Sequence, residues 1–159
     1  MEEKRPPIDE IIRPFIEIVL YPYKAKLIDF GIYKETILRQ YGPQEFVKEF
    51  VRVQSIEEIV PFSYLQVPMT IETEDKILEI GARIYVHSDL SFEIRDVRII
   101  SVTDKERTIT DEEARRDEAR IVKRVKKFIE KWLPIIYGIL DLISKLLERV
   151  KLIGLGGEY

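Results

Sequence analysis

The stretch YLQVPMTIETEDKILEIGARIYVH, residues 64–87, decides the fold because its apolar residues recur at every second position on both sides of one turn. Successive side chains of a strand point to opposite faces, so this spacing gathers the apolar ones on a single face. The spacing predicts two half-buried strands, at 64–73 and 76–87, joined by the turn TEDK. Their apolar positions are Leu65, Val67, Met69, Ile71, Leu78, Ile80, Ala82, Ile84 and Val86.

A third strand is predicted after the turn at 87–89, and its apolar phase changes partway along. One extra residue near Arg95 and Asp96 would produce that change, which predicts a β-bulge. The three strands together predict an antiparallel meander over residues 64–102. We expect its first strand at a sheet edge, because Pro68 has no backbone N–H to donate to a neighbour. The apolar positions of the third strand are Leu90, Phe92, Ile94, Val97 and Ile99.

The region before the meander carries mixed signals. Helical spacing of apolar residues predicts a short helix over 8–19, bent at Pro14 because proline removes a backbone donor. Residues 24–33, KAKLIDFGIY, include β-branched and aromatic side chains and predict a strand. Residues 42–50, GPQEFVKEF, place Pro43 at a favourable first helical position. With Phe46, Val47 and Phe50 on one side, they predict a second short helix.

A long helix is predicted to begin at Thr110, which forms a capping box with Glu113. Its early turns are acidic and its later turns basic, which complements the helix dipole. Pro134 is expected to kink this helix, or to split it in two, near Glu130. Apolar residues at alternating spacings of four and three favour contact with another helix. We call them the helix seam: Ile121, Val125, Phe128, Trp132, Ile135, Ile139, Leu142 and Leu146.

These elements predict an α+β fold, with a small antiparallel meander, short N-terminal helices and a long C-terminal helix or helix pair. At 159 residues the chain has the size of one domain with a helical appendage. We expect an α+β domain at 1–109, a helical region at 110–153 and a flexible tail at 154–159.

Composition excludes several classes of protein. The chain has no cysteine, which rules out disulfides and Cys-based metal sites. Asparagine is absent too, glutamine and methionine are rare, and isoleucine and glutamate are abundant, a pattern typical of a thermophile. A net charge of −3 gives no general attraction to nucleic acid. We expect no cofactor, and a place in the cytoplasm or within a virion or other particle, because the N-terminus lacks a secretory signal pattern.

Residues with catalytic potential are few. His87 is the only histidine, too few for a His-based zinc site, and we interpret it as a surface or turn residue. If Asp89 and Glu93 converged on a magnesium ion, with Arg95 beside a phosphate, the protein would be a metal-dependent nuclease. A half-exposed meander also carries such charges simply to face water, and that interpretation is favoured. The acidic candidates are Asp75, Glu79, Asp89 and Glu93.

The long helix carries a basic run that could grip phosphates of nucleic acid or anionic lipid headgroups. The solvated face of an amphipathic helix explains the same pattern and is favoured. The longest charge-free stretch in the helix, WLPIIYGIL at 132–140, is far shorter than the roughly 20 apolar residues that cross a bilayer, so we expect no transmembrane span. The basic run consists of Arg120, Lys123, Arg124, Lys127 and Lys131.

Four segments, KLIDFGIYKETI, VPMTIETEDKILEIGARIYV, FEIRDVRI and DEEARRDEARIVKR, carry a resemblance to a known family. Between residues 27 and 125 the chain resembles the SPFH domains of stomatins and prohibitins. The shared features are a Phe-Gly turn, a proline-containing strand, a Thr-x-Asp turn and a last strand that leads into a long helix. The tight turn between Val86 and Phe92 departs from that family, which inserts helices there. The resemblance implies a non-enzymatic, membrane-associated scaffold that oligomerises.

The sequence therefore favours a structural or assembly protein of a thermophile, or of its virus, that self-associates or docks through its C-terminal helix. The apolar face of that helix is wider than a two-stranded seam, so we expect it to be buried against its own domain, other copies, or both. The expected partner is a second copy or another protein. Two alternatives remain: a divalent-metal-dependent nuclease, and a protein that binds a membrane surface or nucleic acid through the basic run.

Overall fold

The described residues form an antiparallel sheet of six strands with one helix before it and one long helix after it, which confirms the predicted α+β class. The computed structural model describes residues 6–39, 46–105 and 111–156. Two short 3-10 turns connect elements at Tyr21–Tyr23 and Ile56–Glu58. In chain order the elements are α1 (Ile8–Leu20), β1 (Lys26–Phe30), β2 (Tyr33–Arg39), β3 (Phe46–Arg52), β4 (Ser63–Glu72), β5 (Lys76–Val86), β6 (Phe92–Asp104) and α2 (Asp111–Gly156).

The sheet is ordered β3-β2-β4-β5-β6, and β1 also pairs with β4. The predicted meander is confirmed as β4, β5 and β6. Along the other side of β4, β1 pairs with the end of the strand and β2 with its start. The chain bends between β1 and β2 at Gly31, where a Cβ atom would lie 2.5 Å from the ring of Tyr33. Any other residue at this bend would require the Tyr33 ring to move.

The expected edge position of β4 is wrong, because β4 lies inside the sheet with strands on both sides. Pro68 pairs with Gly81 of β5, and its carbonyl accepts a hydrogen bond from Gly31 N at 3.2 Å. The N–H and C=O of a residue in an antiparallel strand point to the same side. The missing N–H of Pro68 therefore faces the bend between β1 and β2, where the ladder is already interrupted.

The predicted bulge in β6 is confirmed. Arg83 pairs with Asp96 and Ile84 with Ile94, so Arg95 is the extra residue. A second bulge lies further along β6, where Glu79 pairs with Ser101 and Ile80 with Ile99. Ile100 is therefore the extra residue of this second bulge, which the apolar phase had not revealed.

The helix predicted at residues 42–50 is wrong: the described part of this segment belongs to the strand β3. β3 pairs with β2 along its whole length, from Tyr33 opposite Arg52 to Arg39 opposite Phe46. The spacing of apolar residues here fits a helix, but β-branched and aromatic residues also fit a strand. Residues 46–52 form a strand because they pair with β2, which precedes them in the chain. β2 and β3 form a hairpin, which we call the arm.

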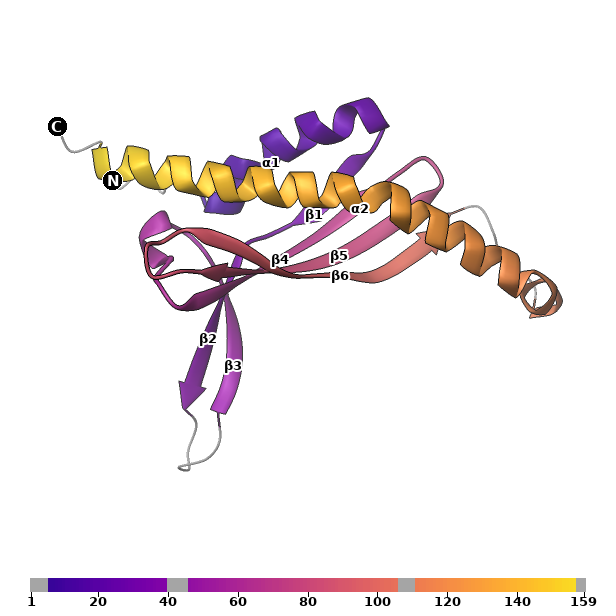
Figure 1. Cartoon of the computed structure of the whole chain (residues 1–159), viewed down its shortest axis with the longest axis horizontal. Helices are drawn as coiled ribbons and strands as arrows, with labels where there is room; N and C mark the ends of the chain where they lie inside the picture. The colour runs from indigo at the N-terminus through magenta and orange to yellow at the C-terminus, as the bar shows by residue number, and fades with distance from the viewer. Residues whose placement is uncertain (1–5, 40–45, 106–110, 157–159) are drawn as a thin grey trace.

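The core lies between one face of the sheet and the two helices. Figure 1 shows α1 and α2 on the same side of the strands, with the arm pointing away on the other side. α1 confirms the helix predicted over 8–19 and buries Ile8, Ile12, Ile16 and Leu20. α2 buries Trp132, Ile136, Ile139, Leu140, Ile143 and Leu147 in the same cluster. All nine apolar positions predicted to face the core from β4 and β5 are buried.

α2 is one continuous helix from Asp111 to Gly156, so the predicted split at its proline does not occur. Pro134 and Glu130 are exposed, and water can satisfy the carbonyl that proline leaves without a donor. The helix also extends past residue 153, into the segment expected to be a flexible tail. Thr110 and residues 157–159 lie outside the described residues, so the capping box and the end of the tail stay predictions.

Burial of α2 on the sheet predicts unequal effects of two neighbouring substitutions. Ile136 is fully buried and Tyr137 is 48% exposed. We expect Ile136→Ala to lower the free energy of unfolding by about 2–5 kcal/mol, because it leaves a cavity. Tyr137→Ala serves as the matched control and is expected to cost less than about 1 kcal/mol. Guanidinium unfolding followed by circular dichroism measures both, and equal losses would contradict this packing.

Candidate functional site on the open face of the sheet

The face of the sheet turned away from the helices is open. On β4 and β5 the alternating positions that face the core are buried, while none of the intervening side chains is. The arm rises from this open face, because β2 continues beyond its short pairing with β4 (Figure 1). The open-face positions are Tyr64, Gln66, Pro68, Thr70 and Glu72 of β4, and Ile77, Glu79, Gly81, Arg83 and Tyr85 of β5.

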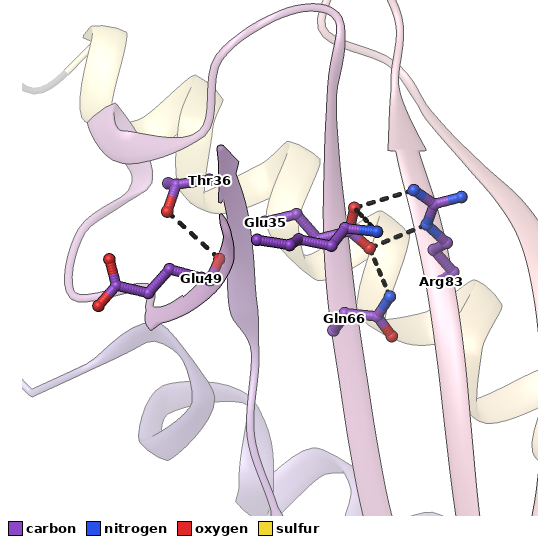
Figure 2. A network of polar contacts seen from close by, with 6 residues as sticks. Glu35, Thr36, Glu49, Gln66 and Arg83 are labelled. Carbon is purple, nitrogen blue, oxygen red and sulfur yellow. Dashed lines mark hydrogen bonds and ion pairs between the residues drawn. The ribbon is translucent and has the colours of Figure 1, made fainter. Parts of the chain in front are cut away.

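Glu35 is the centre of a polar network that ties the arm to the sheet (Figure 2). Arg83 donates two hydrogen bonds to the carboxylate, from Nε to Oε1 and from a terminal nitrogen to Oε2, both 2.9 Å long. Gln66 Nε2 donates to Oε1, and Lys48 Nζ lies 3.2 Å from Oε2. The side chain of Glu35 is only 6% exposed, so all of these contacts form in a largely desolvated position.

The Arg83 hydrogen bonds lower the pKa of Glu35 from 4.5 to about 2, with further contributions from Gln66 and Lys48. Glu35 in turn raises the pKa of Arg83. The guanidinium carbon of Arg83 also lies 3.6 Å from the centre of the Tyr64 ring, a cation–π contact. Hydrogen bonds, opposite charge and ring stacking hold the Arg83 side chain in place, which makes it a rigid wall of the site.

A second ion pair anchors the base of the arm on the side of the helices. Arg52 Nε donates to Asp9 Oδ2 at 2.8 Å, and a terminal nitrogen donates to Oδ1 at 2.6 Å. Asp9 lies in the first turn of α1 and is 2% exposed. The hydrogen bonds to Asp9 raise the pKa of Arg52 above its ordinary value. The arm is thus tied to β5 by one bidentate arginine pair and to α1 by another.

The structure brings His87, Glu93 and Arg95 together at one end of the open face. Glu93 Oε2 lies 3.0 Å from His87 Nε2 and 2.6 Å from Arg95 Nε. The guanidinium of Arg95 lies over the Tyr85 ring, with its carbon 4.8 Å from the ring centre. Glu93 is therefore occupied by the side chains of Arg95 and His87, and its visible role is to hold the β5–β6 end together.

Asp89 plays a local role in the turn after β5. Its Oδ1 accepts hydrogen bonds from Ser91 N at 3.0 Å and from Ser91 Oγ at 2.7 Å, which lower its pKa. Asp75 lies at the opposite end of β5, roughly 30 Å away along the strand. The four acidic candidates therefore do not converge, and the described residues contain no cluster of three metal-binding side chains. This arrangement gives the nuclease interpretation no support.

The helix seam is divided between the core and the surface. Trp132 and Ile139 are buried within the chain's own core, at 3% and 0% exposure. Ile135, Leu142 and Leu146 flank that core and are half-buried. Towards the start of α2, Phe128 stacks beside Trp132, and Val125 is half-buried. The side chain of Ile121 is not among those that the structure describes.

The basic run lies on the part of α2 before the core. Lys123, Arg124, Lys127 and Lys131 are exposed, and none of them forms an ion pair with another described residue. The side chain of Arg120 is not among those described. No helix within 6–39, 46–105 and 111–156 is long and apolar enough to cross a membrane, as the sequence predicted.

The residues of the Glu35 network were not among the sequence candidates. Glu35, Gln66 and Arg83 are far apart in the chain, and only the pairing of β2 with β4 and of β4 with β5 brings them together. Two local signals did mark the same region: Pro68 and Gly81 are both unusual inside a strand and lie opposite each other on the open face.

Searches of family models, curated proteins and solved structures find no match to this chain.

The low pKa of Glu35 predicts acid-dependent stability. A carboxyl with a folded pKa of about 2 and an ordinary value of 4.5 stabilises the fold fully above pH 4.5. That stabilisation is lost as the pH falls from 4.5 towards 2, and its upper size is about 3 kcal/mol. We expect Glu35→Gln to be less stable at pH 7 and to lose this part of the pH dependence.

Chemical unfolding at a series of pH values tests whether Glu35 causes this part of the pH dependence. Glu49→Gln is the matched control, because Glu49 is an exposed carboxylate on the neighbouring strand of the arm. We expect Glu49→Gln to follow the wild-type curve. A Glu35→Gln curve that runs parallel to wild type between pH 4.5 and 2 would contradict the role of Glu35.

Proposed function

We propose that the protein is a non-enzymatic structural or assembly protein that self-associates through the first part of α2. The observation that carries the proposal is that α2 is longer than the stretch of it that packs on the sheet. Among the α2 side chains that the structure describes, Val122 to Leu152, the buried ones lie between Trp132 and Leu147, and Phe128 packs against the same core. About 17 residues, roughly 25 Å of helix, lie between Asp111 and Phe128, the first described side chain that packs against the core. Figure 1 shows this part, in orange, extending beyond the strands.

The extension has an apolar side that continues the line of the core. Val125 and Phe128 follow the same spacing as the buried residues after them, and Val122 is 61% exposed. In proteins most of the stability of a helix comes from packing of its apolar side. Pairing with the extension of a second copy would bury these residues and stabilise the helix. The origin in a thermophile or its virus, and the location in the cytoplasm or a particle, stay predictions.

A second candidate function is binding of an anionic surface or polymer through the basic run. It is favoured by the contrast in pairing: arginines of the sheet and arm, such as Arg52, Arg83 and Arg95, sit against carboxylates, whereas the described cations of the basic run do not. Unpaired cations on a projecting helix are free to neutralise phosphates. The basic run and the helix seam lie on different sides of α2, so the two functions can be tested separately.

Sedimentation and light scattering of the full chain test self-association. We expect wild type to form an oligomer that Val122→Asp combined with Val125→Asp converts to a monomer, because charges would be buried in the pairing. The matched control is Lys123→Gln with Lys127→Gln, which changes exposed residues of the same turns and should leave the oligomer intact. Circular dichroism verifies that each variant is folded.

A wild-type chain that stays monomeric at high concentration would contradict self-association. Binding to DNA or anionic vesicles that is lost in the Lys123→Gln, Lys127→Gln variant, and that weakens with salt, would instead support the second candidate.

A further inference from the structure

Three local departures from regular sheet structure meet at one point of the open face. Pro68 has no backbone N–H to donate to a neighbouring strand. Gly81, directly opposite on β5, has no side chain to pack against its neighbours. Beside Gly81, β6 is interrupted by the bulge at Ile100. Each feature weakens a sheet, and a natural sequence tends to keep such features where function requires them. Their meeting point is therefore the place to look for a binding site.

The bulge at Ile100 shapes the open face around Gly81. Because Ile100 is the extra residue, the regular alternation of β6 places Ile99 towards the core, while Ile100 points to the open face. A Cβ atom built on Gly81 would lie 3.4 Å from Ile100 Cδ1, so the Ile100 side chain leans over the glycine. Because Gly81 has no side chain, the surface at this point is shallow, and the Ile100 side chain forms an apolar wall beside it.

The result is an apolar groove with a volume of about 340 Å³. Phe50 of the arm stands on the side opposite Ile100, and the two side chains are 51% and 60% exposed. Two large apolar side chains left in water around a shallow floor are a feature of binding sites rather than of an ordinary solvated face. The groove is lined by Tyr33, Phe50, Gln66, Pro68, Gly81 and Ile100.

The groove continues into a polar hollow of about 370 Å³, which shares Gln66, Gly81 and Ile100 with it. Two cations that border this hollow, Lys48 and Arg98, each make one ion pair and retain further N–H donors for an anion. Lys48 of the arm is 48% exposed and contacts a carboxylate that Arg83 already satisfies. Arg98 of β6 is 77% exposed, and its ion pair with Asp96 is long, at 3.5 Å.

We propose that this groove binds a small amphiphile that has one short aliphatic chain and one anionic head. The aliphatic chain would lie between Phe50 and Ile100 over the floor formed by Pro68 and Gly81. The head, a carboxylate or a phosphate monoester, would lie over Gln66 between Lys48 and Arg98. Its charge complements those two cations, while Arg83 is held by Glu35 and acts as a wall. The proposal does not depend on self-association, because the groove lies on the face opposite the helices.

Titration of the full-length protein with octanoate, followed by the backbone amide signals in NMR, tests the proposal. We expect saturable shifts centred on residues 50, 81 and 100. Octyl phosphate distinguishes the two kinds of head, and whichever binds more tightly identifies the natural chemistry. Octanol and octyltrimethylammonium carry the same chain with a neutral or a cationic head. Both are expected to bind at least about tenfold more weakly than octanoate, since they cannot pair with the two cations.

Two variants fill or open the groove. Gly81→Val places a branched side chain on the floor, and we expect it to abolish binding while the strand tolerates it, since valine favours strands. Ile100→Ser removes the exposed wall and is expected to weaken binding by about tenfold. Arg98→Gln should weaken octanoate binding several-fold and leave octanol unchanged. The matched control is Val51→Ser, which changes an exposed apolar residue on the other face of the arm.

The absence of saturable shifts with both anionic ligands would overturn the proposal. So would octanoate binding that is unchanged in Gly81→Val, because the ligand would then lie elsewhere. If Gly81→Val does not fold, Ile100→Ser decides the same question. Octanol that binds as tightly as octanoate would overturn the assignment of an anionic head.

Discussion

Burial of one face of the β4–β5 hairpin is the constraint on which the rest of the molecule depends. Nine apolar side chains alternate along these strands, and leaving them in water would cost roughly 1.5–3 kcal/mol for each larger one. α1 and the C-terminal part of α2 cover them, and their buried residues join the same core. Because both helices lie on that face, the other face stays open, and the arm and the groove are found there.

The arm is held by charge more than by apolar packing. Its apolar side chains, among them Ile37, Phe50 and Val51, are exposed, and a two-stranded hairpin is marginal by itself. Two desolvated carboxylates, Glu35 and Asp9, each bind an arginine with two hydrogen bonds. Since one pair joins the arm to β5 and the other joins it to α1, they fix the direction of the arm and therefore the width of the groove beside it.

The core also explains which part of α2 is free to act outside the chain. The described side chains of α2 pack against the core from Phe128 to Val150, and the part of the helix before them extends beyond the strands (Figure 1). The chain therefore has two unlike surfaces, an amphipathic projecting helix and an apolar groove with a basic end. The proposed assembly through the helix would leave the groove free for a ligand, because the two surfaces lie on different faces.

Much of the fold follows from the sequence by itself, since side-chain alternation in strands and apolar spacing in helices are local properties. They determined α1, β1, the meander, the bulge at Arg95 and the long helix. Tertiary structure alone decided what depends on distant partners. Pairing with β2 makes residues 46–52 a strand, and the bend between β1 and β2 lets Pro68 lie inside the sheet. The Glu35–Arg83 pair joins residues 48 positions apart, so no local pattern could reveal it.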